Sequence, residues 1–257
     1  MILETGSILN GAAVGSTASG ATNALVLEGT GTANNAFENF NTLTAESNAS
    51  WALGGSRTLG GASSEFGGAT IDSGALLDFE GQTTIAGTVS GAGTLEFGAS
   101  TALDSGANLS VAHWTVGGIA NVALDENLAY GGTFTGNAGA ALDLSGGSLT
   151  LTGTDLFVGA ATSGSNVLYA EGTTTVLGLG LTVGGTTTFD DMSEVSERAG
   201  SATVGDASGD VAQLAIASGA TWDILDNSGI KRGSSTGCDS KRCRVGSVWI
   251  DLAGGLG

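Results

Sequence analysis

The chain has 257 residues, with 46 glycines, no proline and a hydrophobic fraction of 41%, which is enough for a packed core and excludes disorder along its whole length. Its 25 acidic residues outweigh 7 lysines and arginines, and the formal net charge is −18 at pH 7. Nucleic acids and anionic membranes bind clustered positive charge, so this balance argues against both as partners and fits a secreted or surface-exposed protein. The sequence has no run of 18 apolar residues that could insert into a membrane as a helix.

The start of the chain shows no recognisable export signal. Met1, Ile2 and Leu3 are followed at once by Glu4, without a basic region or an apolar stretch of signal-peptide length. We therefore expect a signal and an anchor to lie outside the chain as given, and this segment not to insert into a membrane.

Short stretches of alternating apolar and polar residues follow one another along the chain. Examples are 94–97 (TLEF), 148–152 (SLTLT) and 173–177 (TTTVL). Alternation with a period of two is the pattern of a strand with one buried face. Glycine pairs, which are typical of turns, separate these stretches at 60–61, 67–68, 117–118, 131–132, 146–147 and 184–185. The pattern predicts an all-β protein.

One short phrase returns along the chain. Its copies are TIDSGALLDF (70–79), ALDSGANLSV (102–111), AIASGATWDI (215–224) and, in a degraded form, TGNAGAALDL (135–144). Each copy joins Gly-Ala to alternating apolar residues, which predicts a tight turn leading into a strand. The glycines of the phrase are Gly74, Gly106, Gly139 and Gly219, and their unequal spacing indicates repeats of irregular length.

A repeat of this kind cannot bury its apolar side alone, whereas stacked copies can. Aromatic residues make up only 5% of the chain, which favours a narrow solenoid core over the core of a sandwich. Proline, which would remove a donor from a strand ladder, is absent. We predict an all-β fold in which residues 1–230 form a right-handed parallel β-helix (solenoid) with irregular rungs of roughly 20 residues.

Two segments carry a resemblance to a known group of proteins. FENFNTL (37–43) and ASWALGG (49–55) resemble a repeat coil of bacterial autotransporter-type passengers, and 181–189, 202–214 and 220–230 resemble the same large surface repeat proteins. The resemblance covers most of residues 1–230. It implies a β-helical, exported and often adhesive surface protein, and it brings no catalytic residues with it.

The last part of the chain differs from the rest. Residues 1–230 contain 23 acids and two cations, Arg57 and Arg198, whereas residues 231–257 contain five cations and both cysteines. Alternation is also lost over residues 236–257. We predict that 231–257 is an atypical basic tail, such as a truncation or a frame-shift would produce. Cys238 and Cys243 alone cannot supply the four ligands of a zinc site; they could close a small disulfide loop, or carry no meaning if the tail is out of frame.

Acidic residues are the first candidates for chemistry. Carbohydrate-active β-helix enzymes, such as polysaccharide lyases and glycosidases, use acids that line a groove, and a lyase also needs a cation beside them. The acids that lie close in sequence are Asp72, Asp78 and Glu80, and Asp104, Asp125 and Glu126. An acidic groove reached by Arg57 or Arg198 would favour this enzyme alternative, but alternating positions place such acids on a solvated face.

The other candidates for chemistry are weaker. Asp206 and Asp210 flank a glycine, and 153–157 (GTDLF) resembles half of a calcium-binding nonapeptide, so a calcium-stabilised secreted repeat protein is a second alternative. His113 is the only histidine, and its neighbours supply no catalytic partner. Trp51 and Trp222 occupy apolar strand positions and are predicted to lie in the core or to fill a corner of the coil.

These observations predict a non-catalytic, structural or adhesive passenger segment outside the cell or on its surface. We predict no catalytic residue, metal site or cofactor. The expected partners are glycans or proteins on host or neighbouring cells. Self-association through uncapped ends of the solenoid is also expected, because open strand edges pair readily.

Overall fold

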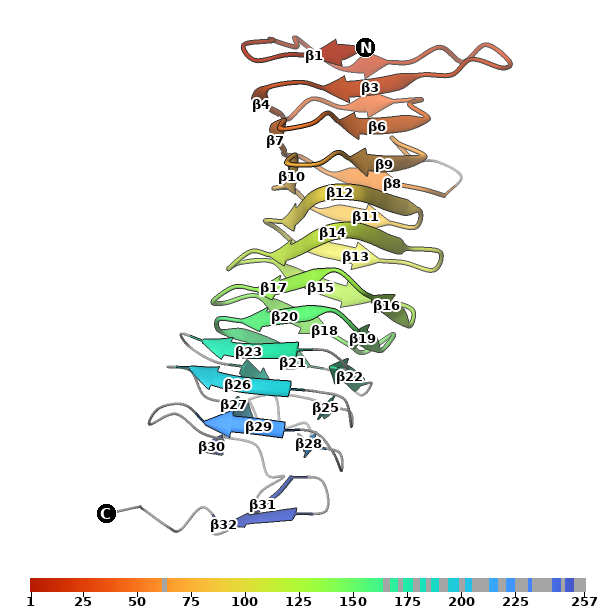
Figure 1. Cartoon of the computed structure of the whole chain (residues 1–257). Coiled ribbons are helices and arrows are strands. Elements are labelled where there is room, and N and C mark those ends of the chain that lie inside the picture. Colours follow the sequence, from red (N-terminus) through yellow and green to blue (C-terminus); the bar gives the residue numbers. More distant parts are fainter. Residues whose placement is uncertain are drawn as a thin grey trace. The chain divides into compact units, whose positions relative to one another are not determined.

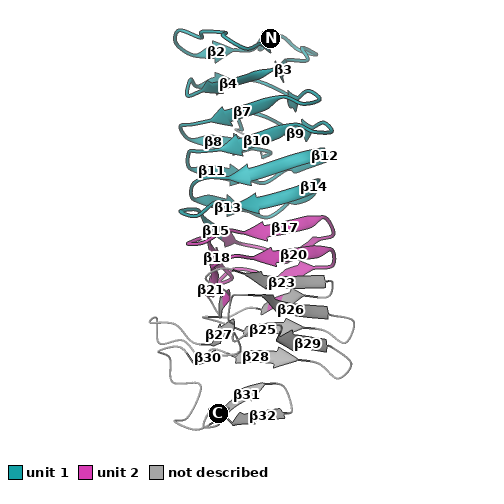
Figure 2. Cartoon of the chain, turned by 60° about the vertical axis from the view of Figure 1, so that its left-hand side comes forward, with its two compact units in different colours: residues 1–122 teal, residues 123–257 magenta. Residues whose placement is uncertain are grey.

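The computed structural model describes residues 1–61 and 64–163 and, beyond residue 163, the strands β22 to β32 (Figure 1). These parts of the chain contain strands and turns but no helix, and so none that could span a membrane. The chain divides into two compact units, Met1–Val122 and Ala123–Gly257 (Figure 2). The predicted all-β class is confirmed.

Unit 1 is built from parallel strands that add on in coils. Its largest sheet contains β1 (Ile2–Leu3), β3 (Ala24–Leu27), β4 (Thr30–Ala33), β6 (Thr42–Ala45), β7 (Ser50–Leu53), β9 (Gly68–Ile71), β10 (Leu76–Phe79), β12 (Thr88–Phe97) and β14 (Asn108–Val116). A second sheet contains β8 (Arg57–Leu59), β11 (Thr83–Ile85) and β13 (Thr101–Leu103), and a third contains β2 (Ala13–Val14) and β5 (Phe37–Glu38).

The coil of unit 1 is right-handed and its rungs are irregular. In Figure 1 the near strands, such as β12, point left and the far strands, such as β11, point right as the chain descends. The successive strands β3, β6, β9, β12 and β14 begin at residues 24, 42, 68, 88 and 108, so one rung contains between 18 and 26 residues. The prediction of a right-handed parallel β-helix with irregular rungs is therefore confirmed.

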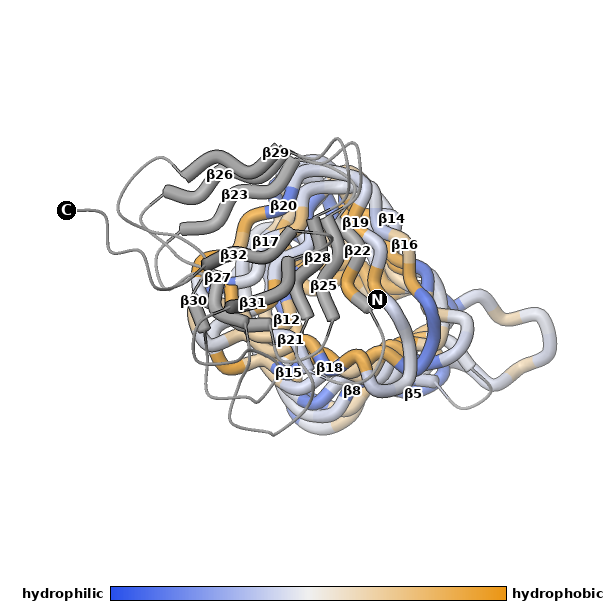
Figure 3. The backbone as a smooth tube through the Cα atoms, turned by 90° about the horizontal axis from the view of Figure 1, so that it is seen from below, coloured by the Kyte–Doolittle hydropathy of each residue, from blue (hydrophilic) through white to orange (hydrophobic). Residues whose placement is uncertain are grey.

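The core of unit 1 consists of in-register columns of apolar side chains. Because every pairing is parallel and the side-chain period is two, each inward residue lies above the inward residue of the next rung. One column contains Leu25, Leu43, Ala69, Val89 and Leu109, and a second contains Trp51, Leu77, Leu95 and Trp114. All are 5% exposed or less. Figure 3, viewed along the coil, shows the backbone of successive rungs of unit 1 lying one over another.

The returning phrase forms the predicted turns. Gly74, Gly106 and Gly139 have φ angles of 75°, 95° and 88°, which a residue with a side chain rarely adopts. In each case the following alanine is buried, and its N–H donates to the carbonyl oxygen three residues earlier, as in a type II turn. Gly219, in the remaining copy, lies outside the described residues.

At one corner of unit 1 the chain forms a single continuous strand, β12, instead of two strands joined by a turn. On one side, β12 pairs with both β9 and β10, which a turn at residues 72–75 separates. On the other side, β12 pairs with β14 through a register shift between Gly91 and Thr94. Gly91 has a φ of 123°, and a Cβ atom there would lie 2.1 Å from the Ile71 carbonyl oxygen, so this bulge requires glycine.

Unit 2 continues the same construction with three parallel sheets. Their strands are β17 (Thr133–Gly136), β20 (Thr154–Phe157), β23 (Thr173–Leu177), β26 (Glu194–Arg198) and β29 (Thr221–Ile224); β18 (Ala141–Asp143), β21 (Ala160–Ser163), β24 (Leu181–Val183), β27 (Ala202–Val204) and β30 (Lys231–Arg232); and β16 (Leu128–Tyr130), β19 (Leu149–Leu151), β22 (Val167–Ala170), β25 (Thr186–Phe189), β28 (Gln213–Ile216) and β31 (Arg242–Val245). The strand β15 (Asn121–Leu124) contains the boundary between the units.

The basic tail contributes one pairing of a different kind. β31 and β32 (Val248–Asp251) are antiparallel, whereas the other strand pairs that the structure describes are parallel. β30, at residues 231 and 232, still pairs in parallel with β27. The predicted division at residue 230 stays a prediction, since residues 225–230 and 233–241 lie outside the described part of the chain.

Candidate functional site

A polar hollow lies at one corner of unit 1. It has a volume of about 340 Å³, and its polar side chains are Ser16, Asn23, Asn39, Asn41 and Ser64. A second hollow of about 370 Å³ shares Ser16, Asn23 and Phe40 with the first. The walls come from three stretches of chain on successive rungs, so the hollow exists only when the coils are stacked.

Asn23 fixes the shape of this corner. Its Oδ1 accepts a hydrogen bond from the Ser16 N–H at 3.1 Å, and its Nδ2 donates to the carbonyl oxygens of Ser16 and Asn39 at 2.8 and 2.7 Å. Its backbone N–H donates to Asn41 Oδ1 at 2.7 Å. The loop that precedes β3 is thereby joined to the corner between β5 and β6.

The next rung closes the corner from the other side. Phe40 forms a parallel bridge with Phe66, and the Gly67 N–H donates to the Phe40 carbonyl oxygen at 3.2 Å. Phe40 is only 6% exposed. Phe40 lines the hollow, and the centre of its ring lies 6.0 Å from the ring centres of Phe37 and Phe66.

Two groups at the hollow are left available. Asn39 and Asn41 are exposed, and within residues 1–61 and 64–163 neither the Asn39 amide nor Asn41 Nδ2 has a hydrogen-bond partner. Each group can bind a hydroxyl: Nδ2 donates, and Asn39 Oδ1 accepts. None of the residues that line this hollow is ionisable. The site is thus neutral, hydrogen-bonding and open.

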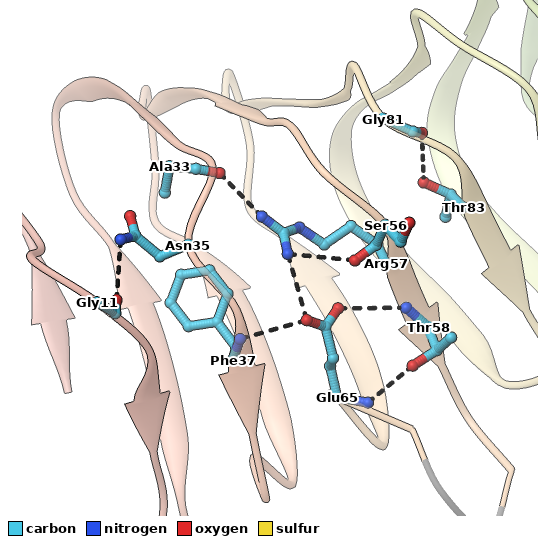
Figure 4. A network of polar contacts seen from close by, with 10 residues as sticks. All are labelled: Gly11, Ala33, Asn35, Phe37, Ser56, Arg57, Thr58, Glu65, Gly81 and Thr83. Atoms are coloured by element: carbon cyan, nitrogen blue, oxygen red, sulfur yellow. Dashed lines mark hydrogen bonds and ion pairs between the residues drawn. The ribbon is translucent and has the colours of Figure 1, made fainter.

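Arg57 lies in the core instead of in a groove. Its side chain is 1% exposed, and it donates to the carbonyl oxygens of Ala33 and Ser56 and to Glu65 Oε1, at 3.0, 3.3 and 3.2 Å (Figure 4). Its guanidinium also lies 5.3 Å from the centre of the Phe37 ring. Burial lowers the pKa of Arg57, and the charge of Glu65 opposes this shift.

Glu65 completes this network from the next loop. Its carboxylate accepts hydrogen bonds from the N–H groups of Phe37 and Thr58 at 3.2 and 3.3 Å. Its own N–H donates to Thr58 Oγ1 at 3.0 Å. The Arg57 side chain is therefore held inside the coil and does not reach an acidic groove, while the side chain of Arg198 lies outside the described residues.

The acidic candidates are divided between turns and one outward cluster. Asp72 and Asp104 begin glycine turns through their carbonyl oxygens. Asp78 lies beside Glu96 in the register of β10 and β12, and its pKa is raised to about 6 by burial first, then by the charges of Glu96 and Glu80. The Gly98 N–H opposes this shift.

The remaining acidic candidates follow Leu124. Asp125 is exposed and Glu126 is half-buried. Among the residues that the structure describes, no three His, Cys, Asp or Glu side chains form a group that could hold a metal ion.

The segment that resembles a calcium repeat does not present its aspartate at a turn. Asp155 lies in the middle of β20 and is 1% exposed, whereas the following Leu156 is half-buried. Burial and the nearby charge of Asp155 raise the pKa of Tyr130. Asp155 therefore belongs to the interior of unit 2. Asp206 and Asp210 lie outside the described residues.

The tryptophans, the histidine and the cysteines named in the sequence analysis form no site among the described residues. Trp51 is 2% exposed, which confirms its predicted place in the core, and its Nε1 donates to the Glu28 carbonyl oxygen at 3.1 Å. His113 points outward from β14 and is exposed. The side chains of Trp222 and Cys243 and the whole of Cys238 lie outside the described part of the chain.

No family model matches this chain, and no curated protein or solved structure matches it either. The resemblance of residues 37–55 to passenger coils therefore stands on their pattern alone. In the structure the apolar positions of that pattern line the core: Phe37, Phe40, Leu43, Trp51 and Leu53 are all 6% exposed or less.

Proposed function

We propose that this chain is a non-catalytic segment of an exported bacterial surface protein of the passenger type, acting through display and adhesive contact. The observation that carries the proposal is a column of hydroxyl side chains on the outer face of the largest sheet of unit 1. Thr44, Thr70, Ser90 and Ser110 follow one another in register, and each is at least partly exposed.

Repetition is what makes such a surface suited to adhesion. Paired strands are about 4.8 Å apart, so the same neutral group recurs at short, fixed intervals along the face. A single hydroxyl binds weakly in water, but many groups held in fixed positions bind together because each new contact is intramolecular. The net charge of −18 keeps such a surface soluble and repels other copies.

The proposal is tested by comparing multivalent with monomeric chain. Beads densely coated with the chain are expected to adhere to bacterial and epithelial cells, at least about 100-fold more strongly than the soluble chain binds. Beads that carry an unrelated acidic protein of similar net charge are the control.

Two results would contradict the proposed function. One is adhesion no stronger than that of the control beads. The other is enzymatic turnover, detected as the release of reducing ends or unsaturated uronates from a panel of bacterial and plant polysaccharides, which would favour a carbohydrate-active enzyme.

A further inference from the structure

We propose that the asparagine hollow of unit 1 binds a neutral saccharide through Asn39 and Asn41. This inference rests on the proposed adhesive function, for which it supplies a class of ligand. It is carried by the shape of the hollow, by the unsatisfied groups at its rim and by the backbone conformation of Asn39.

The size of the hollow suits a small carbohydrate. Binding sites for small molecules typically have volumes of about 300–1,000 Å³, and 340 Å³ lies at the lower end of that range, with room for about one or two sugar rings. The second hollow shares Ser16 and Asn23 with the first, so a longer oligosaccharide could extend into it.

The chemistry of the rim matches vicinal hydroxyl groups. The Asn39 amide can donate and accept, and Asn41 Nδ2 can donate, so neighbouring hydroxyls of one ring would each find a partner. Phe40 also lines the hollow, with 6% of its surface exposed. Because the lining has no ionisable group, a uronate, a sialic acid or a phosphate would lose its hydration without gaining an opposite charge.

Two of the asparagines that line the hollow, Asn23 and Asn41, are held in place before a ligand arrives. The side chain of Asn23 makes three hydrogen bonds through Oδ1 and Nδ2, and its backbone N–H makes a fourth, as described above. The hydrogen bond that Asn41 Oδ1 accepts from the Asn23 N–H holds the Asn41 amide in one orientation. This bond therefore also fixes the position of Nδ2. Groups that are already ordered lose less entropy on binding, which raises the affinity of a small site.

Asn39 occupies a left-handed backbone position that glycine would fill equally well. Its φ angle is 60°, and Asn39 and Asn48 are the only non-glycine residues with positive φ in the described part of the chain. Glycine would adopt this conformation without steric penalty. The Asn39 side chain nevertheless makes no hydrogen bond within the described residues, so a role toward a ligand is a reason for asparagine instead of glycine at this position.

The test uses a variant that leaves the backbone unstrained. N39G removes the amide at a position where glycine is favoured, and N41D keeps the Oδ1 acceptor for the Asn23 N–H but replaces the Nδ2 donor with a charged oxygen. N48G is the matched control, because it makes the same change at the other positive-φ asparagine, which does not line the hollow.

Binding is measured by NMR titration of the whole chain with maltose, lactose and mannobiose, and with digalacturonate as the acidic comparison. We expect at least one neutral disaccharide to bind at millimolar or lower concentration, with the largest shifts at the residues that line the hollow, such as Asn23, Asn39 and Asn41. N39G and N41D should each weaken this binding about tenfold, the loss of roughly one or two hydrogen bonds, while N48G leaves it unchanged.

The proposal is overturned if no neutral disaccharide binds at tens of millimolar, if digalacturonate binds more tightly in the hollow, or if N39G binds as well as the original chain. Failure of the two proposals can be told apart. Beads that adhere equally well with N39G would leave adhesion standing without the saccharide site. Disaccharide binding that N39G abolishes, on beads that do not adhere, would leave the site without adhesion.

Discussion

Two inward columns of side chains run side by side through β8, β11 and β13, one apolar and one polar. The apolar column consists of Leu59, Ile85 and Leu103. The polar column lies two residues earlier in each strand and consists of Arg57, Thr83 and Thr101. All six residues are 3% exposed or less, so the same geometry buries both kinds of side chain.

The comparison shows two ways in which a solenoid can accept polar groups in its interior. Thr83 Oγ1 donates to the Gly81 carbonyl oxygen at 3.0 Å, and Thr101 Oγ1 donates to that of Ala99 at 3.4 Å, so each hydroxyl finds its partner two residues back in its own rung. Arg57 instead depends on Glu65 and on the Ala33 carbonyl oxygen. The threonines are therefore locally satisfied, whereas the arginine needs contacts from separate loops.

The largest expected effect comes from removing the partner of the buried arginine. Glu65→Ala leaves the Arg57 charge in the core without its opposite charge, and removes the acceptor for the Phe37 and Thr58 N–H groups. We expect a loss of roughly 3–5 kcal/mol in the free energy of unfolding, as for other broken buried ion pairs. Urea denaturation followed by circular dichroism measures it.

Arg57→Met is the informative counterpart. It removes the buried charge, fills much of the same space and leaves a carboxylate whose side chain is 17% exposed and still accepts two backbone N–H groups. We expect a loss of only about 1–2 kcal/mol, because the charge left unpaired, that of Glu65, keeps two backbone hydrogen bonds and partial contact with solvent. Equal losses for the two variants would show that the network contributes through its contacts and not through charge pairing.

An effect somewhat smaller than that of Glu65→Ala is expected in the apolar column. Ile85→Ala removes three carbons from a side chain that is 0% exposed, between Leu59 and Leu103. The cavity and the lost burial should lower the free energy of unfolding by about 3 kcal/mol. A loss below about 1 kcal/mol would indicate that the rungs move together to fill the space, so that the columns are not rigid.

Thr83→Val tests the polar column with almost no change of shape. The substitution removes the Thr83 hydroxyl and its hydrogen bond to the Gly81 carbonyl oxygen, which then lacks this donor. We expect a change within about 1 kcal/mol, clearly smaller than for Glu65→Ala. A loss as large as that of Glu65→Ala would contradict the view that the hydroxyls are only locally satisfied.

Much of this architecture was predictable from the sequence. Alternation identifies the inward residues, and the phrase around Gly74 and Gly106 identifies the turns. A further copy at residues 46–49 is missed because asparagine replaces glycine: Asn48 has a φ of 63°, and the buried Ala49 donates its N–H to the Glu46 carbonyl oxygen at 2.8 Å. Asparagine tolerates the left-handed region, so this copy could have been found.

The buried arginine also left a signal in the sequence. Arg57 lies two residues before Leu59, and a period of two places both on the same face of the strand. Its partner was not predictable, since Glu65 lies in a loop whose path depends on the length of the rung. The same reason applies to the asparagine hollow, which combines residues from 16–23 and 39–41 with Gly61, Ser64 and Gly67. Rungs that vary from 18 to 26 residues do not reveal from sequence which corners meet.

An effect similar in size to that of Thr83→Val is expected in a polar column that faces outward. Asp78 and Glu96 are register neighbours and repel each other, in contrast to the satisfied threonines inside. The pKa of Asp78 is raised from 3.8 to about 6 in the folded chain, so between those values the folded state holds more protons than the unfolded state. The contribution of Asp78 to stability therefore falls as the pH rises from about 4 to about 6.

Asp78→Asn should remove this dependence. The variant is expected to be more stable than the original chain at pH 7 by on the order of 1 kcal/mol, a value reduced for partial exposure to solvent, and equal to it at pH 4. Glu96→Gln should lower the pKa of Asp78, because one repelling charge is gone, and should reproduce part of the gain. Urea midpoints at both pH values, with carboxyl shifts of Asp78 followed by NMR, measure these effects. A stability difference between Asp78→Asn and the original chain that does not change with pH would show that the stacked carboxylates do not act through their ionisation.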